Sequence, residues 1–401
     1  MKVAYYSPLP PSRSGVADYS ALLLPALGRR LEVEPVRPGR FRREPKGDVS
    51  VYHVGNDPEA HGWILEALRR RPGVVVLHEF VLHHLVAGMT LARGDADGYK
   101  DALEREHGLV GRLLAYAVLD NKLPPLWETR PEDFPLAGEV LRLATGLIVH
   151  SRFVEERARA AGFDGPIWRI PHPAWPLPAI ERAGVEGAPL VGCFGHLNES
   201  KRVPQLLEAF ARLRASRPGA RLLLVGAASR RVADRLAGDG VLREDYVDEP
   251  RLWSLMAACD VCVSLRSPTM GETSGSAIRA LSLGKPLVVS DVGWFAELPD
   301  SVALKAAVDE HEVETIVAAL ELLAGDEGVR LAMGRAAREL VEREHDLERV
   351  AELYAAALEE AAGGPAVRDA VLREVAGAAA GVGLRETAEL AERLGEVGLG
   401  R

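Results

Sequence analysis

The stretch Leu190-Val-Gly-Cys-Phe-Gly-His-Leu-Asn-Glu-Ser-Lys-Arg202 decides the fold of this chain. Its apolar start, Leu190–Phe194, predicts a short buried strand that ends at Gly195 in a polar turn. The turn leads into a helix from Val203 to about Ser216, because apolar side chains recur there on one helical face. A strand, a glycine turn and a helix in this order indicate one unit of a parallel α/β sheet.

The same order of elements recurs on both sides of this unit. The first strand of the chain is followed by a loop, Ser7–Gly15, and by a helix near Asp18–Arg29. Short apolar runs bounded by turn residues predict strands at Lys2–Tyr6, Val49–Val54, Val74–His78, Gly146–His150, Arg221–Val225, Val261–Leu265 and Leu287–Ser290. Alternating strands and helices predict parallel sheets that are covered by helices on both faces.

A proline-rich segment, Ile170–Pro178, separates two such halves. Proline fixes the backbone and lacks an amide donor, so this segment is expected to be a linker that runs to about Pro189. A chain of 401 residues is about right for two domains. We predict an α/β protein with two Rossmann-like domains, at 1–175 and 176–345, whose parallel sheets face each other across a cleft. Further helices are expected in 346–401, and the first of them should pack back on the N-terminal domain.

Composition excludes some classes of protein. The net charge of −9 disfavours a nucleic-acid binder, which is usually basic. No apolar run reaches the roughly 18 residues that span a membrane, and the N-terminus lacks the apolar region of a signal peptide. We therefore expect a cytoplasmic protein. The locally basic stretch Arg37–Lys46 is either a solvated loop or a contact for an anionic acceptor or a lipid surface, so membrane association stays open.

Two groups of residues raise the question of a metal, and neither predicts one. Cys259 and Cys262 lie in an apolar run without a second cysteine pair, so we expect them to pack in a core. His78-Glu79 precedes His83-His84, but this spacing differs from that of the helical zinc motif. Neighbouring side chains on a helix also point roughly 100° apart. No metal ion or other cofactor is expected.

The turn after Leu190–Phe194 has the composition of an anion site. Gly195 leaves backbone amides accessible, and His196 follows it. Lys201 and Arg202 then place positive charge at the start of a helix, where the helix dipole is also positive. This combination predicts binding of a diphosphate.

The segment Arg266–Arg279 predicts a second anion site beside the first. Four small residues should lie at a helix N-terminus, where amides lack helical partners: Thr273, Ser274, Gly275 and Ser276. Glu272 precedes them. A carboxylate beside a phosphate is unfavourable unless it accepts hydrogen bonds from sugar hydroxyls. The two features together favour a ligand that carries both phosphate and sugar.

Polar residues also follow the strands of the first half. Ser14, Gly15 and Asp18 come after the first strand, where a structural turn and a binding loop are equally compatible with the sequence. His78 follows the Val74–His78 strand as a candidate hydrogen-bond donor to a substrate hydroxyl. His53, Asn56 and His61 are expected to belong to the same wall, or to be ordinary hydrogen-bonded residues.

These motifs together resemble retaining glycosyltransferases of family 4, which have the GT-B fold. The resemblance is carried by Gly195–Arg202, Arg266–Arg279, Gly-Lys285-Pro, Val289-Ser-Asp-Val-Gly293 and Ser14-Gly-Val-Ala-Asp-Tyr19, and it reaches to about residue 360. It implies that the N-terminal domain holds the acceptor and the C-terminal domain holds a nucleotide-sugar, a UDP or GDP sugar. The nucleotide-sugar is a substrate, so no cofactor is implied.

The resemblance also implies roles for individual residues. Lys201 would contact the diphosphate, the amides around Ser274–Ser276 would cradle the distal phosphate, and Glu272 would hold the transferred sugar. Tyr246 and Val247 lie where the family reads the base, and His78 would lie near the anomeric carbon and the acceptor. Catalysis would thus depend on Glu272, Lys201 and His78, without a metal.

Two residues depart from the family pattern. His196 stands where arginine is usual, and Arg279 stands where a second glutamate normally holds the ribose. Glu272 is also displaced by one residue from the usual spacing. Arg279 would instead contact a phosphate or an anionic sugar.

We expect a metal-independent transferase that moves a sugar from a nucleoside diphosphate to a hydroxyl acceptor, with retention of configuration. Two alternatives stay open. A sugar-nucleotide epimerase of the same architecture would need no acceptor wall. A degenerate homologue could act only as a binding protein, and the replacements at His196 and Arg279 are the reason to consider it.

Overall fold

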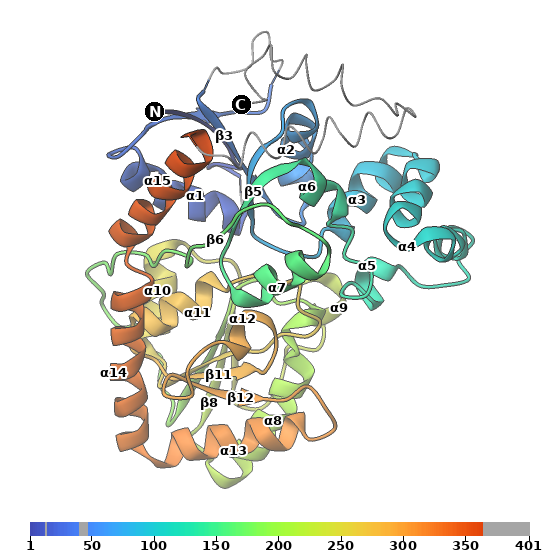
Figure 1. Cartoon of the computed structure of the whole chain (residues 1–401). Helices are drawn as coiled ribbons and strands as arrows, with labels where there is room; N and C mark the ends of the chain where they lie inside the picture. Colours follow the sequence, from blue (N-terminus) through green and yellow to red (C-terminus); the bar gives the residue numbers. More distant parts are fainter. Residues whose placement is uncertain (13, 40–46, 364–401) are drawn as a thin grey trace, which may run out of the picture.

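The computed structural model contains two parallel six-stranded sheets, one above the other in Figure 1. It describes residues 1–12, 14–39 and 47–363. Most of the basic stretch Arg37–Lys46 and the predicted tail helices, Ala366–Ala380 and Leu384–Leu394, lie outside these residues. Two domains with Rossmann-like sheets confirm the predicted fold class.

The first sheet has the strand order β2-β1-β3-β4-β5-β6. Its strands are β1 (Lys2–Tyr6), β2 (Glu32–Val36), β3 (Val49–Val54), β4 (Gly73–Leu77), β5 (Ala144–Val149) and β6 (Ile167–Arg169). The helices of this half are α1 (Gly15–Leu27), α2 (Pro58–Arg70), α3 (His83–Thr90), α4 (Ala96–Leu119), α5 (Leu126–Thr129), α6 (Gly138–Leu143) and α7 (Arg152–Ala160), with a 3-10 turn η1 (Leu91–Arg93).

Both faces of the first sheet are buried, as a parallel sheet requires. On β3, Tyr52 and Val54 face α2, α6 and α7, whereas Val49 and Val51 face the opposite layer. That layer is formed by α1 and by the last described helix, α15 (Leu347–Gly363). Helix α15 therefore packs on the N-terminal sheet although it follows the second domain in sequence (Figure 1).

The second sheet has the order β12-β11-β10-β7-β8-β9. Its strands are β7 (Leu190–Phe194), β8 (Arg221–Val225), β9 (Val241–Glu244), β10 (Val261–Ser264), β11 (Leu287–Ser290) and β12 (Ala303–Ala306). Its helices are η2 (Glu199–Lys201), α8 (Val203–Ser216), α9 (Arg230–Ala233), α10 (Glu249–Ala258), α11 (Gly275–Ser282), α12 (Gly293–Ala296), α13 (Glu312–Gly325) and α14 (Glu327–Glu344).

This sheet also has two buried faces. Leu190 and Phe194 pack with α10, α11 and α14, and Val191 and Cys193 pack with α8 and α13. Cys259 and Cys262 lie in the first of these clusters as free thiols, so they are core residues.

The strands that the sequence analysis did not predict are β2, β6, β9 and β12, which are the edges of the two sheets. An edge strand is short and partly exposed, so it lacks the continuous apolar run of a central strand. Helix α1 begins at Gly15, three residues earlier than expected, because the Ser14 hydroxyl caps it by accepting the Ala17 N–H.

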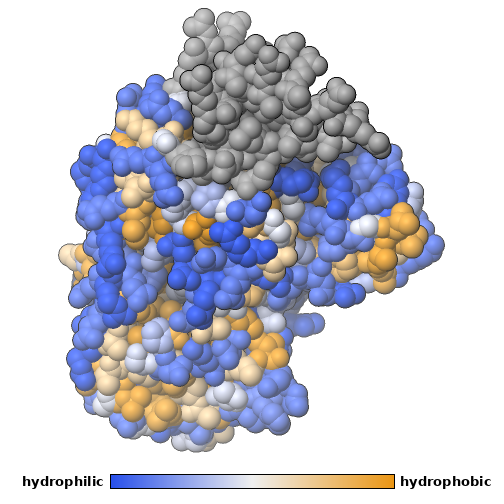
Figure 2. All heavy atoms as spheres, viewed as in Figure 1, coloured by the Kyte–Doolittle hydropathy of each residue, from blue (hydrophilic) through white to orange (hydrophobic). Residues whose placement is uncertain are grey.

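Helices α3, α4 and α5 form a separate helical layer beside the first sheet, with their own apolar cluster. Four large apolar side chains of α4 are exposed, namely Leu109, Val110, Leu113 and Tyr116. Figure 2 shows apolar surface at the end of the molecule where Figure 1 places α4. Among the described helices, none combines the length and apolarity needed to cross a membrane.

Candidate active site

The carboxyl ends of the two sheets face each other, and loops from both domains are joined there. After β4, the Phe80 and Val81 amides donate to the Met270 carbonyl, at 2.7 and 3.0 Å. After β5, the amides of Arg152 and Phe153 donate to the carboxylate of Glu297, at 3.0 and 2.7 Å. In open α/β sheets ligands bind beyond the carboxyl ends of strands, so this junction is the candidate site.

Gly195 is the point at which the two predicted anion-binding loops meet. It has φ +98°, and a Cβ atom on it would lie 3.6 Å from Lys201 Nζ and 3.9 Å from Ser276 Oγ. The lysine of the first loop and the serine of the second therefore border one glycine. A backbone without a side chain at this position leaves room for a ligand to approach both groups.

Lys201 is buried, and its ammonium donates to the Phe194 carbonyl at 3.0 Å. Burial first, and then the charge of the neighbouring Arg266 guanidinium, lower its pKa to about 8. Two cations held close together in a desolvated place repel each other, and an anion between them would relieve this repulsion.

The N-terminus of α11 supplies amides beside these cations. Ser274 caps the helix, since its hydroxyl accepts the Ala277 N–H at 3.2 Å and lies 3.1 Å from Ser276 Oγ. Thr273 Oγ1 is buried without a hydrogen-bond partner among the described residues. Gly275 follows the cap and leaves its amide at the open first turn.

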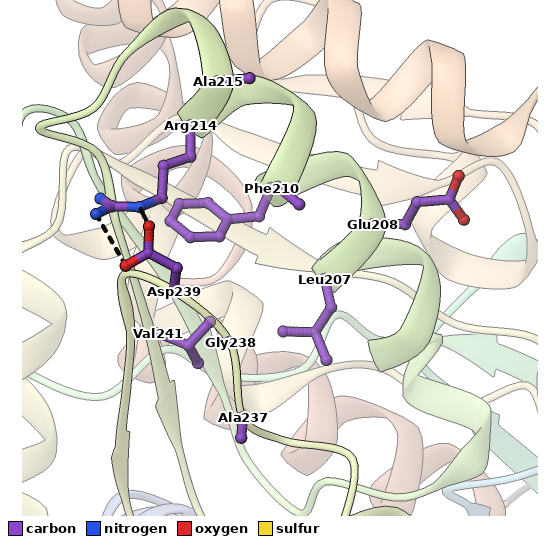
Figure 3. Close-up of a pocket in the computed structure, with 10 residues that line it drawn as sticks. Leu207, Glu208, Phe210, Arg214, Ala215, Ala237, Gly238, Asp239 and Val241 are labelled. Atoms are coloured by element: carbon purple, nitrogen blue, oxygen red, sulfur yellow. Dashed lines mark hydrogen bonds and ion pairs between the residues drawn. The ribbon is translucent and has the colours of Figure 1, made fainter.

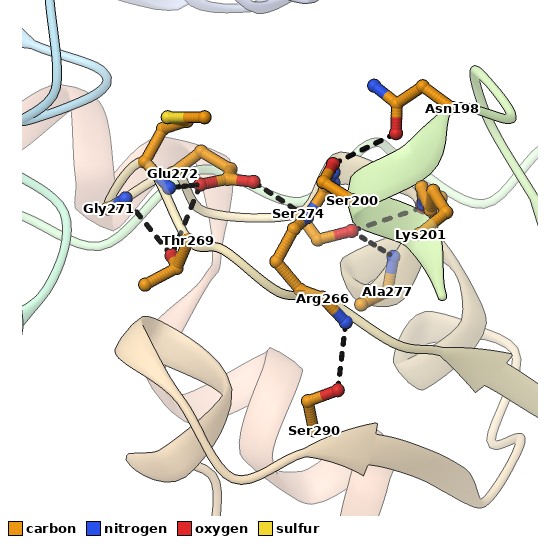
Figure 4. Close-up of polar contacts among 12 residues, drawn as sticks. Asn198, Ser200, Lys201, Arg266, Thr269, Gly271, Glu272, Ser274, Ala277 and Ser290 are labelled. Atoms are coloured by element: carbon orange, nitrogen blue, oxygen red, sulfur yellow. Dashed lines mark hydrogen bonds and ion pairs between the residues drawn. The ribbon is translucent and has the colours of Figure 1, made fainter. Parts of the chain in front are cut away.

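Glu272 is held in place by Arg266, which connects it to the first loop (Figure 4). The guanidinium lies 2.7 Å from one carboxylate oxygen and donates to Ser200 Oγ at 2.7 Å. The other oxygen accepts the Met270 N–H at 2.8 Å. Sequence reasoning did not single out Arg266 or Ser200 as site residues. Their position, directly after a strand and in the Lys201 loop, was the signal that could have identified them.

Arg279 lies flat over Trp175 of the linker, with its guanidinium carbon 3.4 Å from the ring centroid. It is 9% exposed, and one amino group lies 3.4 Å from Glu249. Asp18, from α1 of the other domain, is close enough for the Arg279 charge to lower its pKa, although burial raises that pKa more strongly. Arg279 thus brings the linker, α10 and the first domain together.

Tyr246 and Val247 lie on the loop that leads into α10. Tyr246 is 68% exposed, and Val247 is partly buried against the core. The loop continues into α10 through Asp248, whose carboxylate caps that helix. His196, in the Lys201 loop, is exposed.

Arg202 does not provide the charge that we expected at the helix start. Its guanidinium pairs with Glu312 of α13, which is only 2% exposed, through Nε at 3.0 and 3.1 Å and through Nη2. A buried carboxylate requires a cation, so Glu312 takes the Arg202 side chain away from the Lys201 side of the loop. This ion pair does not support a role of Arg202 in donor binding, and that role stays a prediction.

The first-domain histidines form a buried cluster instead of an open wall. Its members surround the Tyr19 ring with centroids 4.8 to 5.8 Å away. We call this the histidine cluster: Tyr19, His53, His78, His150 and His172. Burial lowers the pKa of each imidazole, to about 4 for His150, so these rings are neutral near pH 7.

His53 is fully buried, and its Nδ1 lies 2.9 Å from His78 Nε2. His61 is also buried and bonds the His53 carbonyl. Both side chains are covered in this structure, and their assignment to the acceptor wall stays a prediction. His78, 9% exposed, is the member at the strand end. Asn56 bonds Leu85 N–H through its side chain, and Gly15 and Asp18 are exposed at the start of α1.

Glu79, which the sequence analysis weighed only as part of a possible metal group, is a further residue of the junction. It lies between His78 and the Phe80 amide that binds Met270, and it accepts the Asn56 N–H at 2.7 Å. Burial, together with the charge of Glu272, raises its pKa to about 7. A lone carboxylate in a polar loop has no distinctive sequence pattern, so only the fold reveals it.

Two other kinds of site were considered among the described residues, a metal site and a separate groove. No group of three or more histidine, cysteine or acidic side chains there could hold a metal ion. An open groove of about 480 Å³ lies between α8 and residues 237–241, beside the Arg214–Asp239 ion pair (Figure 3). It lies toward the amino ends of the strands, because α8 runs away from Lys201, and it shares no residue with the junction.

Comparison with known proteins found a family model that matches part of the second domain. Residues 188–326 match the family model described as "Glycosyl transferases group 1". The match spans β7 to α13, and it includes Lys201, Arg266 and Glu272. This part of the second domain is thus similar to group 1 glycosyltransferases. No curated protein sequence matches the chain significantly.

Solved structures are similar over nearly the whole chain. Sucrose-phosphate synthase from Thermosynechococcus elongatus aligns with a TM-score of 0.60 at 16% identity, covering 90% of this chain and 98% of that one. HepE from Anabaena in complex with UDP-glucose aligns with a TM-score of 0.59 at 15% identity, covering 90% and 100%. WaaG, a glycosyltransferase involved in lipopolysaccharide biosynthesis, aligns with a TM-score of 0.56 at 15% identity, covering 89% and 99%. These similarities identify the fold as GT-B.

Proposed function

We propose that this protein transfers a sugar from a nucleoside diphosphate, a UDP or GDP sugar, to a hydroxyl group of an acceptor. The observation that carries this proposal is the meeting of Lys201 Nζ and Ser276 Oγ at Gly195, together with the Arg266–Glu272 pair that contacts Ser200 of the same loop. Cations and helix amides suit the diphosphate, and a carboxylate held at their side suits sugar hydroxyls.

The second domain would bind the donor. Lys201 and the first amides of α11 stabilise the charge that builds on the diphosphate as it leaves. Arg266 orients Glu272 toward the transferred sugar. In this assignment Tyr246 and Val247 border the base, and Arg279, stacked on Trp175, offers its remaining donors to an anionic part of the ligand.

The first domain would hold the acceptor next to the departing diphosphate. Asn56 and His78 follow the carboxyl ends of β3 and β4, and Ser14, Gly15 and Asp18 lie at the start of α1. We propose that no metal takes part and that the anomeric configuration is retained, on the resemblance to family 4 enzymes. Domain limits at about residues 175 and 345 follow from the linker and from α15.

The first experiment is a thermal-shift screen with UDP, GDP, ADP and their sugars, since a ligand that binds only the folded state raises its stability. We expect one nucleotide series to raise the Tm. A flat response to all of them would contradict donor binding and would favour a degenerate homologue.

A second experiment separates transfer from isomerisation. The donor found in the screen is incubated without an acceptor, and the nucleotide-sugar is analysed. An isomerised nucleotide-sugar would favour the epimerase alternative, whereas release of free nucleotide that rises with added alcohols supports transfer.

The role of Glu272 is tested by Glu272→Gln. Loss of its charge weakens the contacts to sugar hydroxyls and to Arg266, so turnover of nucleotide-sugar should fall by about 10-fold or more, with a smaller change in the affinity for bare nucleotide. Calorimetry with nucleotide and a turnover assay give the two values. Equal losses in both would contradict a sugar-holding role.

A further inference from the structure

Two carboxyl groups of the first domain lie at the donor loop of the second domain. Glu132 accepts the Thr269 N–H at 3.1 Å, and the other group is Glu79. The two amides that follow it, Phe80 and Val81, donate to the Met270 carbonyl. Met270 is two residues before Glu272, and a Cβ on Gly271 would lie 3.1 Å from Phe80 Cβ. The backbone therefore ties Glu79 to the same loop that presents the sugar-holding carboxylate.

The Glu79 side chain is held by one fixed hydrogen bond. Its Oε2 accepts the Asn56 N–H at 2.7 Å, and the Asn56 side chain in turn accepts the Leu85 N–H at 3.1 Å. The other oxygen, Oε1, has no hydrogen-bond partner among the described residues. A partly buried carboxylate with one oxygen anchored and one unoccupied is suited to accept a proton or a hydroxyl hydrogen bond from a ligand.

The charges around Glu79 come from two elements. Glu272 and Arg266 act on it from the donor loop, and Asp57 acts on it from the N-cap of α2. Glu272 and Arg266 form an ion pair, so their opposite effects on the Glu79 pKa partly cancel. The two acidic neighbours and burial favour the protonated form of Glu79, and its pKa is raised to about 7. Near neutral pH the group can both accept and release a proton.

We propose that Glu79 is the residue that takes the proton from the acceptor hydroxyl during transfer. This inference rests on the transferase function proposed above. The acceptor oxygen forms a bond to the anomeric carbon, and the bond from that carbon to the diphosphate oxygen breaks with its electron pair on the diphosphate. The acceptor proton passes to Glu79 Oε1 and from there to solvent.

Two variants test this role. Glu79→Gln retains an oxygen to accept the Asn56 N–H but cannot take a proton. Glu59→Gln is the matched control, because Glu59 is an exposed carboxylate on α2 of the same domain. Both are assayed as full chains with the donor found in the thermal-shift screen and with ethanol or trifluoroethanol as acceptor. Nucleotide affinity is measured by calorimetry.

For Glu79→Gln we expect turnover with ethanol to fall by about 100-fold, the usual scale of general base catalysis, with nucleotide affinity changed less than about twofold. The acidic limb of the pH profile near pH 7 should disappear. The deficit should shrink with trifluoroethanol, because a more acidic alcohol needs less help from a base. Glu59→Gln should behave like the unmodified protein.

Two outcomes overturn the proposal. Turnover of Glu79→Gln within about threefold of the unmodified protein, or an unchanged acidic limb, would mean that another group takes the proton. An equal deficit with both alcohols would mean that Glu79 only positions the loop. Failure of the transferase proposal itself looks different, since then neither the unmodified protein nor Glu59→Gln would bind nucleotide or release it from the donor.

Discussion

Two buried polar groups lie at the carboxyl ends of the two sheets, and they are built in opposite ways. In the second domain, Lys201 and Arg266 are cations held close together beside Glu272. In the first domain, the histidine cluster contains rings whose pKa values are all lowered, so it carries no charge at neutral pH. Burying like charges costs free energy, whereas burying neutral imidazoles costs less.

This difference indicates that the charged group of the second domain binds a ligand and that the neutral histidine cluster of the first domain has a structural role. Two buried cations that share one carboxylate would be stabilised by a further anion, and this is the property that we propose for the donor site. The histidine cluster is bonded internally, for example between His53 and His78 and between Tyr19 and Tyr354 of α15. It therefore shapes the wall on which His78 and Glu79 stand.

The largest expected effect is acid unfolding through the histidine cluster and His61. His150 and His61 have folded pKa values of about 4, below the ordinary value of 6.5. The unfolded chain therefore binds protons that the folded chain does not, and stability that is complete above pH 6.5 is lost as the pH falls toward 4. Each such histidine costs about 1.4 kcal/mol at pH 5.5, so the cluster should cost several kcal/mol.

Urea unfolding at pH 7.5 and pH 5.5 measures this loss. His150→Gln, which cannot be protonated, should flatten the dependence on pH. If the free energy of unfolding is the same at both pH values, the imidazoles of the histidine cluster are not held neutral. The proposed difference between this cluster and the Lys201–Arg266 group would then be wrong.

The next effect concerns Arg202, which the structure assigns to Glu312. In Arg202→Met the buried Glu312 loses its cation, and the free energy of unfolding should fall by about 3 kcal/mol. Nucleotide affinity should change little, because the side chain points to α13. Denaturation and calorimetry give the two values, and a large loss of affinity in a stably folded Arg202→Met would return Arg202 to the donor site.

Lys201→Ala is expected to weaken nucleoside-diphosphate binding by about 1.5–3 kcal/mol, the scale of a charged hydrogen bond. Lys285→Ala is the matched control. Lys285 is a half-buried lysine whose ammonium, like that of Lys201, donates to backbone carbonyls, here those of Ala257 and Cys259. It should lower the Tm without lowering affinity. Unchanged affinity in Lys201→Ala by calorimetry would remove the central element of the proposed site.

The smallest effect is alkaline loss of binding. The Lys201 pKa of about 8 means that the ammonium loses its proton as the pH rises through 8, while a bound diphosphate favours the charged form. Affinity should therefore be constant below pH 7 and fall about tenfold by pH 9. Titrations in that range check it, and Lys201→Ala should show no such decrease.

The central strands of the two sheets were predictable from sequence, because a strand that is buried on both faces has a continuous run of apolar residues. Strands β1, β3, β7, β8 and β11 match the predicted bounds. Their glycine turns and polar residues also pointed to the loops that the structure brings together at Gly195. Edge strands such as β2, with the sequence Glu-Val-Glu-Pro-Val, escaped because one side of an edge strand has no pairing neighbour and tolerates polar residues and proline.

Side-chain partners were not predictable in the same way. Glu312 lies 110 positions from Arg202 in the sequence. No local sequence pattern predicts that the Arg202 guanidinium compensates the buried charge of Glu312. His53 reads like a site residue because it ends a strand, yet the packing of α1 and α15 over the sheet encloses it. A position on a strand is local information, whereas its access to a ligand depends on what covers it.

The sequence by itself determined the order of strands and helices, the linker, and the loops in which cations, small residues and acidic residues gather. Only the tertiary structure decided which of these residues meet: it brings Lys201 and Ser276 to Gly195, pairs Arg266 with Glu272 and turns Arg202 to Glu312. The physical reason is that apolar periodicity is a local property of the chain, whereas compensation of a buried charge is a contact between distant segments.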